Sequence, residues 1–165
     1  MARQTFFSFH FERDVWRAAN VRNSWRYQKE SERQDFGFWD AAKWEETKRK
    51  GEDAVHKWID DQLKGTSVTV VLIGSETSTR PYVGYEIKQS YSRGNGLLGV
   101  YIHNIKDVDQ KTCAKGPNPF DSWSITENGI KKYFSTLFAT YDWVNDDGRS
   151  NIGGWIEAAA KNAGR

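Results

Sequence analysis

Short apolar runs alternate with longer amphipathic segments along this chain. The strongest run covers residues 67–75 and is rich in β-branched side chains. Such a run predicts a strand buried on both faces, the kind found at the centre of a parallel sheet. A polar turn follows, and Pro81 then predicts the first position of a helix, where its missing N–H does no harm.

The remaining segments predict alternating strands and helices around this central strand. The other predicted strands are 5–10, 36–40, 97–102 and 137–144. One predicted helix begins at Glu12 and carries an apolar stripe of Val15, Ala18, Val21 and Trp25. The other predicted helices cover residues 44–63, 81–93 and 151–163. This order predicts an α/β fold with a parallel, doubly wound sheet of five strands, built as one domain over residues 1–165.

Two segments of the second half are predicted to lie outside the sheet. Residues 104–124 are polar and contain Gly116, Pro117 and Pro119, so they predict a long surface loop, a feature that is more often functional than idle. Residues 130–134 predict a helical turn.

Charge and cysteine content narrow the classes of function. The chain has 24 basic and 22 acidic residues, a near balance that favours neither a nucleic-acid nor a membrane surface. Its single cysteine, Cys113, cannot form a disulfide within the chain and so predicts a reducing, cytosolic compartment. The first residues lack the apolar core of a signal peptide, and no apolar run is long enough to span a bilayer.

Several familiar nucleotide and phosphate sites do not fit the order of elements. Gly94-x-Gly96-x-x-Gly99 matches a dinucleotide fingerprint, but it follows a predicted helix and precedes a strand, the reverse of what pyrophosphate binding needs. A phospho-receiver would need an aspartate where the central strand ends in Ser75. A flavodoxin would hold the phosphate of FMN in a hydroxyl-rich turn after its first strand, whereas the hydroxyl-rich residues 77–79 follow the third predicted strand. This argues against a flavodoxin, though less decisively than the missing aspartate argues against a phospho-receiver.

Metal and cysteine chemistry receive little support. His10, His56 and His103 fall on three different elements, and no Cys or His pair has ligand spacing. Asp107-x-Asp109 is better explained as a solvated loop, and Cys113 has no histidine that the sequence places beside it.

Carboxylates at strand ends are the remaining candidates for chemistry. Asp40 ends the second predicted strand, and Glu86 shares a helix face with Tyr82 just after the third. The turn after the first strand contains His10, Glu12 and Arg13. All three turns open on one edge of a parallel sheet, so these groups can converge on one cleft. Position alone leaves Glu86 open between a site residue and a surface glutamate favoured by the helix dipole.

Extended motifs in the first two thirds of the chain resemble a known family. They are Phe7-Ser8-Phe9-His10 with residues 21–25, the segment 57–74, and Arg80-Pro81-Tyr82-Val83-x-Tyr85-Glu86-Ile87 with residues 94–99. Over about residues 5–105 the chain resembles the bacterial TIR-like domains of the Thoeris anti-phage defence system (ThsB type). The resemblance implies the flavodoxin-like TIR fold, a three-layer sandwich.

The resemblance also implies an enzyme that cleaves the nicotinamide–ribose bond of NAD and releases a cyclic ADP-ribose-type signal. Such enzymes carry an essential glutamate in the pattern aromatic, three residues, Glu. Tyr82-x-x-x-Glu86 fills this pattern, with Tyr where Trp is usual, so Glu86 is the expected catalytic residue. Phe9, His10, Asp40, Ser75 and Tyr82 are the expected substrate-binding residues.

The implied partners are NAD as substrate, a separate effector that responds to the nucleotide signal, a phage-derived trigger and further copies of the chain. No cofactor and no metal are expected. A non-enzymatic TIR-like module that assembles with partner proteins is the alternative, and a flavodoxin-like nucleotide binder is a more distant one.

Overall fold

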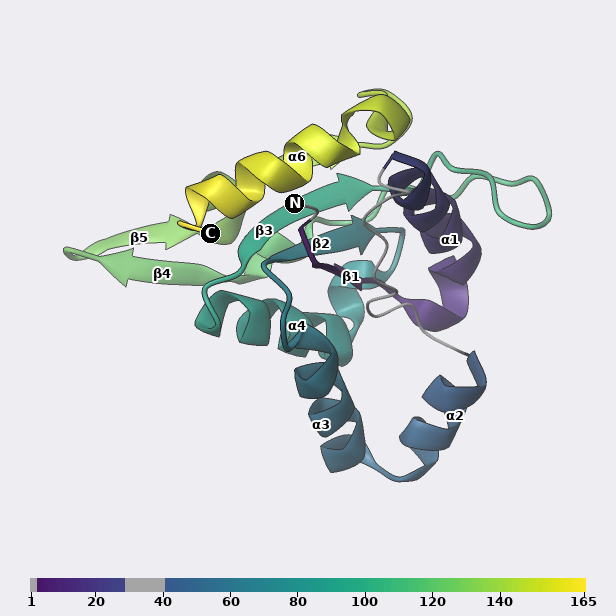
Figure 1. Ribbon diagram of the computed structural model, residues 1–165, viewed down its shortest axis with the longest axis horizontal. Helices are drawn as coiled ribbons and strands as arrows, with labels where there is room; N and C mark the ends of the chain where they lie inside the picture. Colours follow the sequence, from purple (N-terminus) through teal and green to yellow (C-terminus); the bar gives the residue numbers. More distant parts are fainter. Residues whose placement is uncertain (1–2, 29–40) are drawn as a thin grey trace.

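A parallel sheet of four strands forms the centre of the computed structural model, which describes residues 3–28 and 41–165 (Figure 1). The strands are β1 (Thr5–Ser8), β2 (Val68–Ile73), β3 (Gly96–Tyr101) and β6 (Thr140–Asp142), in the spatial order β1-β2-β3-β6. Each pair is parallel, with Phe7 opposite Val70 and Val71 opposite Gly99. This confirms the predicted parallel α/β fold. The fifth predicted strand, residues 36–40, lies outside the described residues.

Helices cover both faces of this sheet. They are α1 (Phe11–Gln28), α2 (Ala41–Arg49), α3 (Glu52–Leu63), α4 (Pro81–Ser92), the one-turn α5 (Phe134–Leu137) and α6 (Gly148–Asn162), with 3-10 turns η2 (Thr77–Thr79) and η3 (Pro119–Ser122). Helix α6 runs along one face and α4 along the other (Figure 1). No helix in the described ranges is both long and apolar enough to cross a membrane.

Strand β2 is fully buried because its side chains pack alternately into two hydrophobic cores, one on each face of the sheet. Val70 and Leu72 pack into the core that contains Ile152 and Ile156 of α6, whereas Val71 and Ile73 pack with Ile87 of α4 and its neighbours. Successive side chains of a strand point to opposite faces, so an uninterrupted apolar run suits a strand covered on both sides. The predicted central strand and the helix that begins at Pro81 are both confirmed.

The prediction of one helix over 44–63 is wrong, because the chain reverses at Gly51. Helix α2 ends at Arg49, α3 begins at Glu52, and Gly51 between them has φ 102°. That backbone conformation is easy for glycine and strained for other residues, so the helix breaks there. The reversal lets α2 fold back toward the start of α1 instead of continuing the line of α3.

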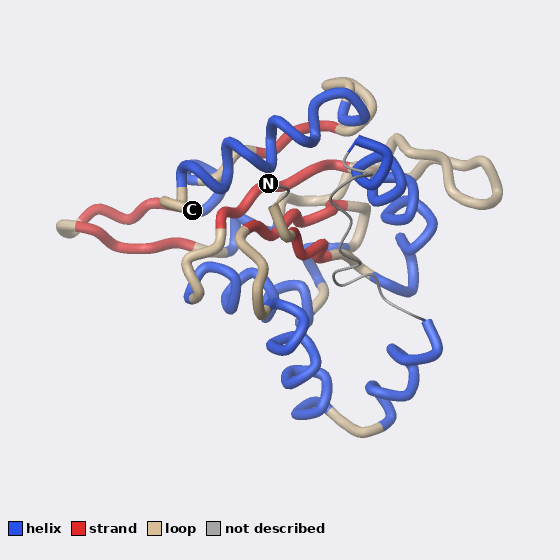
Figure 2. Tube along the Cα trace, in the orientation of Figure 1, coloured by secondary structure: helices blue, strands red, loops and turns tan. Residues whose placement is uncertain are grey.

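Two smaller expectations also need correction. Val15 is 36% exposed, so the buried stripe of α1 runs through Ala18 and Val21 instead; the side chain of Trp25 lies outside the described residues. The predicted helical turn at 130–134 is an antiparallel hairpin of β4 (Ser124–Glu127) and β5 (Ile130–Tyr133), which projects from the body (Figure 2). Asn128 and Gly129 connect the strands with positive φ, the turn that Asn-Gly favours.

The predicted surface loop, residues 104–124, is buried in its second half. Gly116, Pro119 and Phe120 are all buried, and the backbone of Gly116 lies against the carbonyl groups of Gly74 and Ser75. The second half of the loop therefore covers the carboxyl end of β2, whereas residues 108–112 of its first half are exposed, as predicted.

Replacing Gly116 with alanine is expected to lower the free energy of unfolding by about 2 kcal/mol, because overpacking against rigid backbone is costly. An added Cβ would lie 2.2 Å from the carbonyl oxygen of Gly74, too close to be accommodated without backbone movement. Urea denaturation measures the change. Gly154→Ala on the exposed side of α6 is the matched control, because its Cβ would meet nothing within 4 Å and should stabilise the helix slightly. Equal effects of the two substitutions would contradict the packing described here.

Candidate functional site

A cavity of about 330 Å³ opens where β1 and the start of α4 meet α2. Its lining residues are Phe9, His10, Phe11, Glu12, Trp44, Lys48, Arg80, Pro81, Tyr82, Val83 and Glu86. Four of the residues expected from the sequence, namely Phe9, His10, Tyr82 and Glu86, thus lie around one cavity. They reach it because the first turns after β1 and β2 open on the same edge of the sheet.

Glu86 is an acidic side chain deep in this site, with only 2% of its surface exposed. Burial raises its pKa well above the usual value for glutamate, and a nearby Ser8 hydroxyl opposes this rise to a smaller extent. Ser8 Oγ and Glu86 Oε2 are nevertheless both buried without a hydrogen-bond partner of regular geometry among the described residues. An unpaired carboxyl oxygen beside a cavity is available to a bound ligand, since buried polar atoms are normally paired.

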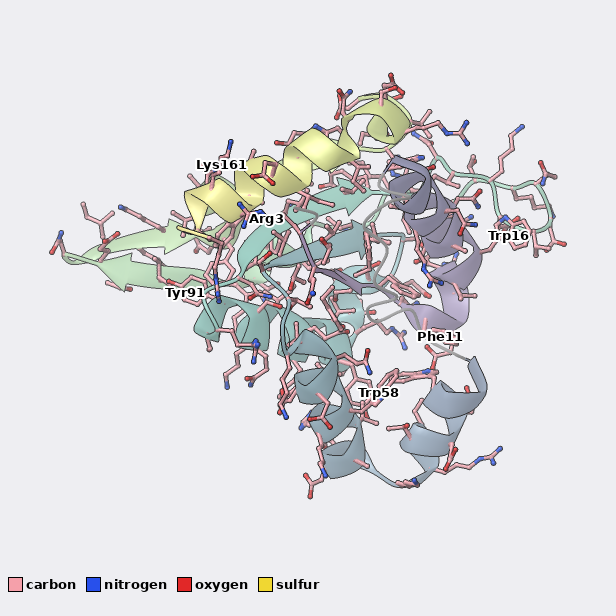
Figure 3. The ribbon with its side chains drawn as sticks, in the orientation of Figure 1. Arg3, Phe11, Trp16, Trp58, Tyr91 and Lys161 are labelled. Carbon is pink, nitrogen blue, oxygen red and sulfur yellow. The ribbon has the colours of Figure 1, made fainter. Side chains whose placement is uncertain are left out.

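Aromatic rings form one wall of the cavity around Trp44. The centroid of its ring lies 5.9 Å from that of Phe11, 5.8 Å from that of Trp58 and 5.8 Å from that of Tyr82, the last in an edge-on arrangement. Figure 3 shows the side chains of Phe11 and Trp58 approaching the region of α2 from two different helices. Such a wall suits a flat, apolar or cationic ring.

Charged groups line the mouth of the cavity. Glu12 Oε1 accepts a hydrogen bond from Lys48 Nζ at 2.7 Å and a longer one from Trp44 Nε1 at 3.4 Å. Partial burial tends to raise the pKa of Glu12, but the bond from Lys48 and further hydrogen bonds outweigh it, so the net pKa is lowered. Glu12 Oε2 lies 3.5 Å from His10 Nε2, whose pKa is lowered by burial and then by the positive charge of Arg80.

Sequence reasoning missed Trp44, Lys48 and Arg80. Trp44 and Lys48 were assigned to a continuous helix, and only the reversal at Gly51 brings them to the site. The glycine was the available signal, since a positive φ there would end the helix. Arg80 immediately precedes the first helical position of α4; it opens the family-like motif at residues 80–87, but the sequence assigns it no role there.

Two expected substrate-binding residues do not join this group. Ser75 is not among the lining residues; its buried Oγ has no partner among the described residues, and its carbonyl lies under Gly116. Asp40 lies outside the described residues. The roles assigned to both stay predictions.

The turn between β2 and α4 uses hydroxyl groups internally. Thr77 Oγ1 accepts a hydrogen bond from the Gly74 N–H at 2.8 Å, and Thr79 Oγ1 donates to the Glu76 carbonyl at 2.7 Å. These two hydroxyls therefore stabilise the strand end and the 3-10 turn, which weakens the comparison with the phosphate turn of a flavodoxin.

Comparison with known proteins gives two matches. A family model described as "Thoeris protein ThsB, TIR-like domain" matches residues 6–107, a range that contains every lining residue of the cavity. A protein of Bacillus cereus (strain MSX-D12) named "Putative cyclic ADP-D-ribose synthase ThsB1" is 32% identical over 193 aligned residues, which cover 94% of this chain and 100% of that relative.

Proposed function

Because the chain belongs to the Thoeris ThsB TIR-like family, we propose that it consumes NAD and converts it to a cyclic ADP-ribose-type signal of anti-phage defence. The observation that carries this proposal is the buried carboxyl of Glu86, which has an unpaired oxygen and lines a cavity with an aromatic wall. The name of the Bacillus cereus relative, a cyclic ADP-D-ribose synthase, supports the same chemistry.

Glu86 is proposed as the catalytic residue. When the nicotinamide–ribose bond breaks, its electron pair goes to the nicotinamide nitrogen, and the ribose carbon develops oxocarbenium character. A carboxylate beside that carbon stabilises the positive charge. Nicotinamide leaves as a neutral molecule, so the step needs no general acid, and we propose that it needs neither a metal nor a cofactor. Attack on the ribose carbon by a nucleophilic atom of the adenine end of the same NAD molecule, with loss of a proton where that atom carries one, closes the cyclic product.

The other site residues are proposed to hold the substrate. Phe9 and Tyr82 offer ring faces and edges for nicotinamide, and His10 offers a neutral imidazole at the mouth. Asp40 and Ser75 retain their predicted roles in substrate binding.

The signalling partners belong to the same proposal. The nucleotide would act in the cytoplasm on a separate effector protein, and a phage-derived component or self-association of the chain would switch the enzyme on. Exposed apolar side chains such as Trp16 and Val108, which are 48% and 65% exposed, are compatible with protein contacts. They also keep open the alternative of a non-enzymatic TIR-like interaction module.

Incubation of the purified chain with NAD tests the proposal. We expect loss of NAD and appearance of nicotinamide and a nucleotide with the mass of ADP-ribose less one water, detected by mass spectrometry. The reaction is run with and without an extract of phage-infected cells, because the enzyme is proposed to need a trigger. Unchanged NAD under both conditions, with a folded protein, would favour the interaction module.

A further inference from the structure

Helix α2 is fastened to the start of α1 through one carboxylate. Trp44 and Lys48 stand four residues apart on α2, so they share one face of that helix. Both donate to the same oxygen, Glu12 Oε1, at 3.4 and 2.7 Å. The Lys48 ammonium also lies 5.6 Å from the centre of the Trp44 ring, so the three side chains form one compact unit.

The far end of α2 has the features of a hinge. Gly51 has φ 102°, and a Cβ built there would meet nothing within 4 Å, so the connection to α3 is unpacked. Glu45, Glu46 and Arg49 of α2 are exposed, and Glu45 forms a second, longer ion pair with Lys48 at 3.5 Å. In Figure 1, α2 and α3 extend together away from the sheet and meet at the end remote from it. The helix is thus held to the site by Trp44 and Lys48, and Gly51, an unpacked glycine, follows it three residues after Lys48.

This anchoring decides whether the cavity is closed. Trp44 and Lys48 supply the α2 side of the lining, and Trp44 contacts Phe11 and Tyr82 across it. If α2 moves away, the aromatic wall opens and water reaches the space beside Glu86. Exclusion of water matters for this chemistry because a cationic ribose can be captured by any nucleophile present.

We infer that Glu12 is a positioning residue that holds α2 as a movable wall over the NAD site and so controls how much water reaches the ribosyl centre. The inference rests on the proposed function. With the wall closed, a nucleophilic atom of the adenine end bonds to the ribose carbon, losing a proton where it carries one, and the product is cyclic. With the wall open, water bonds to the same carbon, loses a proton, and leaves linear ADP-ribose. Glu12 therefore favours cyclisation over hydrolysis without touching the reacting atoms.

Substitutions at Glu12 and Lys48 test this through two kinetic readouts. Glu12→Ala is expected to raise KM for NAD about tenfold, as the loss of charge-assisted hydrogen bonds implies, with a smaller change in kcat. It should also raise the fraction of linear ADP-ribose several-fold. Glu12→Gln keeps a neutral acceptor for Trp44 and Lys48 but loses the charge of the ion pair, so its KM and product ratio should lie between those of the wild-type protein and of Glu12→Ala. Lys48→Glu should resemble Glu12→Ala, and the exchange Glu12→Lys with Lys48→Glu should recover part of the loss, because it restores the ion pair.

Amide hydrogen exchange tests the same inference without NAD cleavage. Amides of residues 41–49 should exchange faster in Glu12→Ala than in the wild-type protein, while those of α6 stay unchanged. Asp61→Ala is the matched control, because Asp61 forms an exposed ion pair with Lys64 at 3.0 Å on α3 and is not part of the cavity lining. This control should alter neither the product ratio nor the exchange of α2.

Two results would overturn the inference. One is a wild-type KM and product ratio in Glu12→Ala together with unchanged exchange over α2. The other is a charge exchange no better than Lys48→Glu alone. A wild-type protein that leaves NAD intact would instead count against the proposed function, and the exchange measurement would still show whether Glu12 fastens α2.

Discussion

Glu86→Gln is expected to reduce NAD cleavage by about a thousandfold or more, since the proposed catalysis depends on a negative charge next to a developing cation. Glutamine has nearly the same shape and can occupy the same buried position, but it cannot carry that charge. Its amide can still hydrogen-bond the ribose, so NAD binding should change far less than kcat. NAD loss followed by mass spectrometry, together with calorimetric titration of NAD, separates the two effects.

Controls for this substitution come from within the chain. Glu127→Gln removes an exposed carboxylate that pairs with Lys132 on the hairpin and should leave NAD consumption unchanged. The melting temperature of Glu86→Gln should be at least that of the wild-type protein, because an uncharged group is easier to bury. A purified Glu86→Gln protein that consumes NAD at the normal rate would exclude Glu86 as the catalytic residue.

The core of the fold was predictable because the residue types in β2 and α4 indicate directly which elements are buried and where they begin. Val68–Ile73 can be covered on both faces only inside a layered sheet, and Pro81 marks a helix start by its chemistry. The break at Gly51 was not predicted, because helical spacing continues on both sides of it; the glycine, which tolerates a positive φ, was the one local signal. The hairpin was missed for the opposite reason: Ile130 and Tyr133 are exposed, so no burial pattern reveals their strand.

The candidate site was predictable as far as sheet topology extends. Parallel strands bring their carboxyl ends together, which gathered His10 and Glu86 from separate parts of the chain. Trp44 and Lys48 reach the cavity because α2 packs beside it. The spacing of residues around positions 44 and 48 does not predict that packing. The burial of Glu86, which separates a surface glutamate from a site residue, likewise depends on neighbours that only the folded chain assembles.

The activity of the wild-type protein should depend steeply on pH because of the burial of Glu86. Its pKa is raised well above the usual value for glutamate, so the carboxylate proposed for catalysis should take up its proton at a higher pH than an exposed glutamate would. Below that pKa, kcat/KM should fall about tenfold for each pH unit, as expected when one proton must leave. The acid limb of kcat should lie at lower pH, because the cationic nicotinamide of bound NAD favours the carboxylate. Initial rates across a range of pH and NAD concentration measure both profiles.

His10 is the titratable neighbour that could imitate this behaviour. Its pKa is lowered, chiefly by burial and next by Arg80, so it should be neutral over most of the working range. His10→Asn removes its titration and should leave the acid limb of kcat/KM in place, whatever its effect on KM. Disappearance of the limb in His10→Asn would assign it to the histidine instead of Glu86.

Stability provides an independent measure of the same ionisation. A carboxyl whose pKa is higher in the folded than in the unfolded chain binds its proton more tightly when folded. Its contribution to stability is therefore fully present below the unfolded-state pKa, about 4.3, and is lost as the pH rises through the folded-state pKa. In that window, the free energy of unfolding of the wild-type protein should fall relative to that of Glu86→Gln by about 1 kcal/mol per pH unit. Urea denaturation of both proteins from pH 4 to 8 isolates this difference, since their other groups titrate alike. A difference independent of pH would mean that Glu86 keeps an ordinary pKa, and the steep acid limb of kcat/KM would then need another origin.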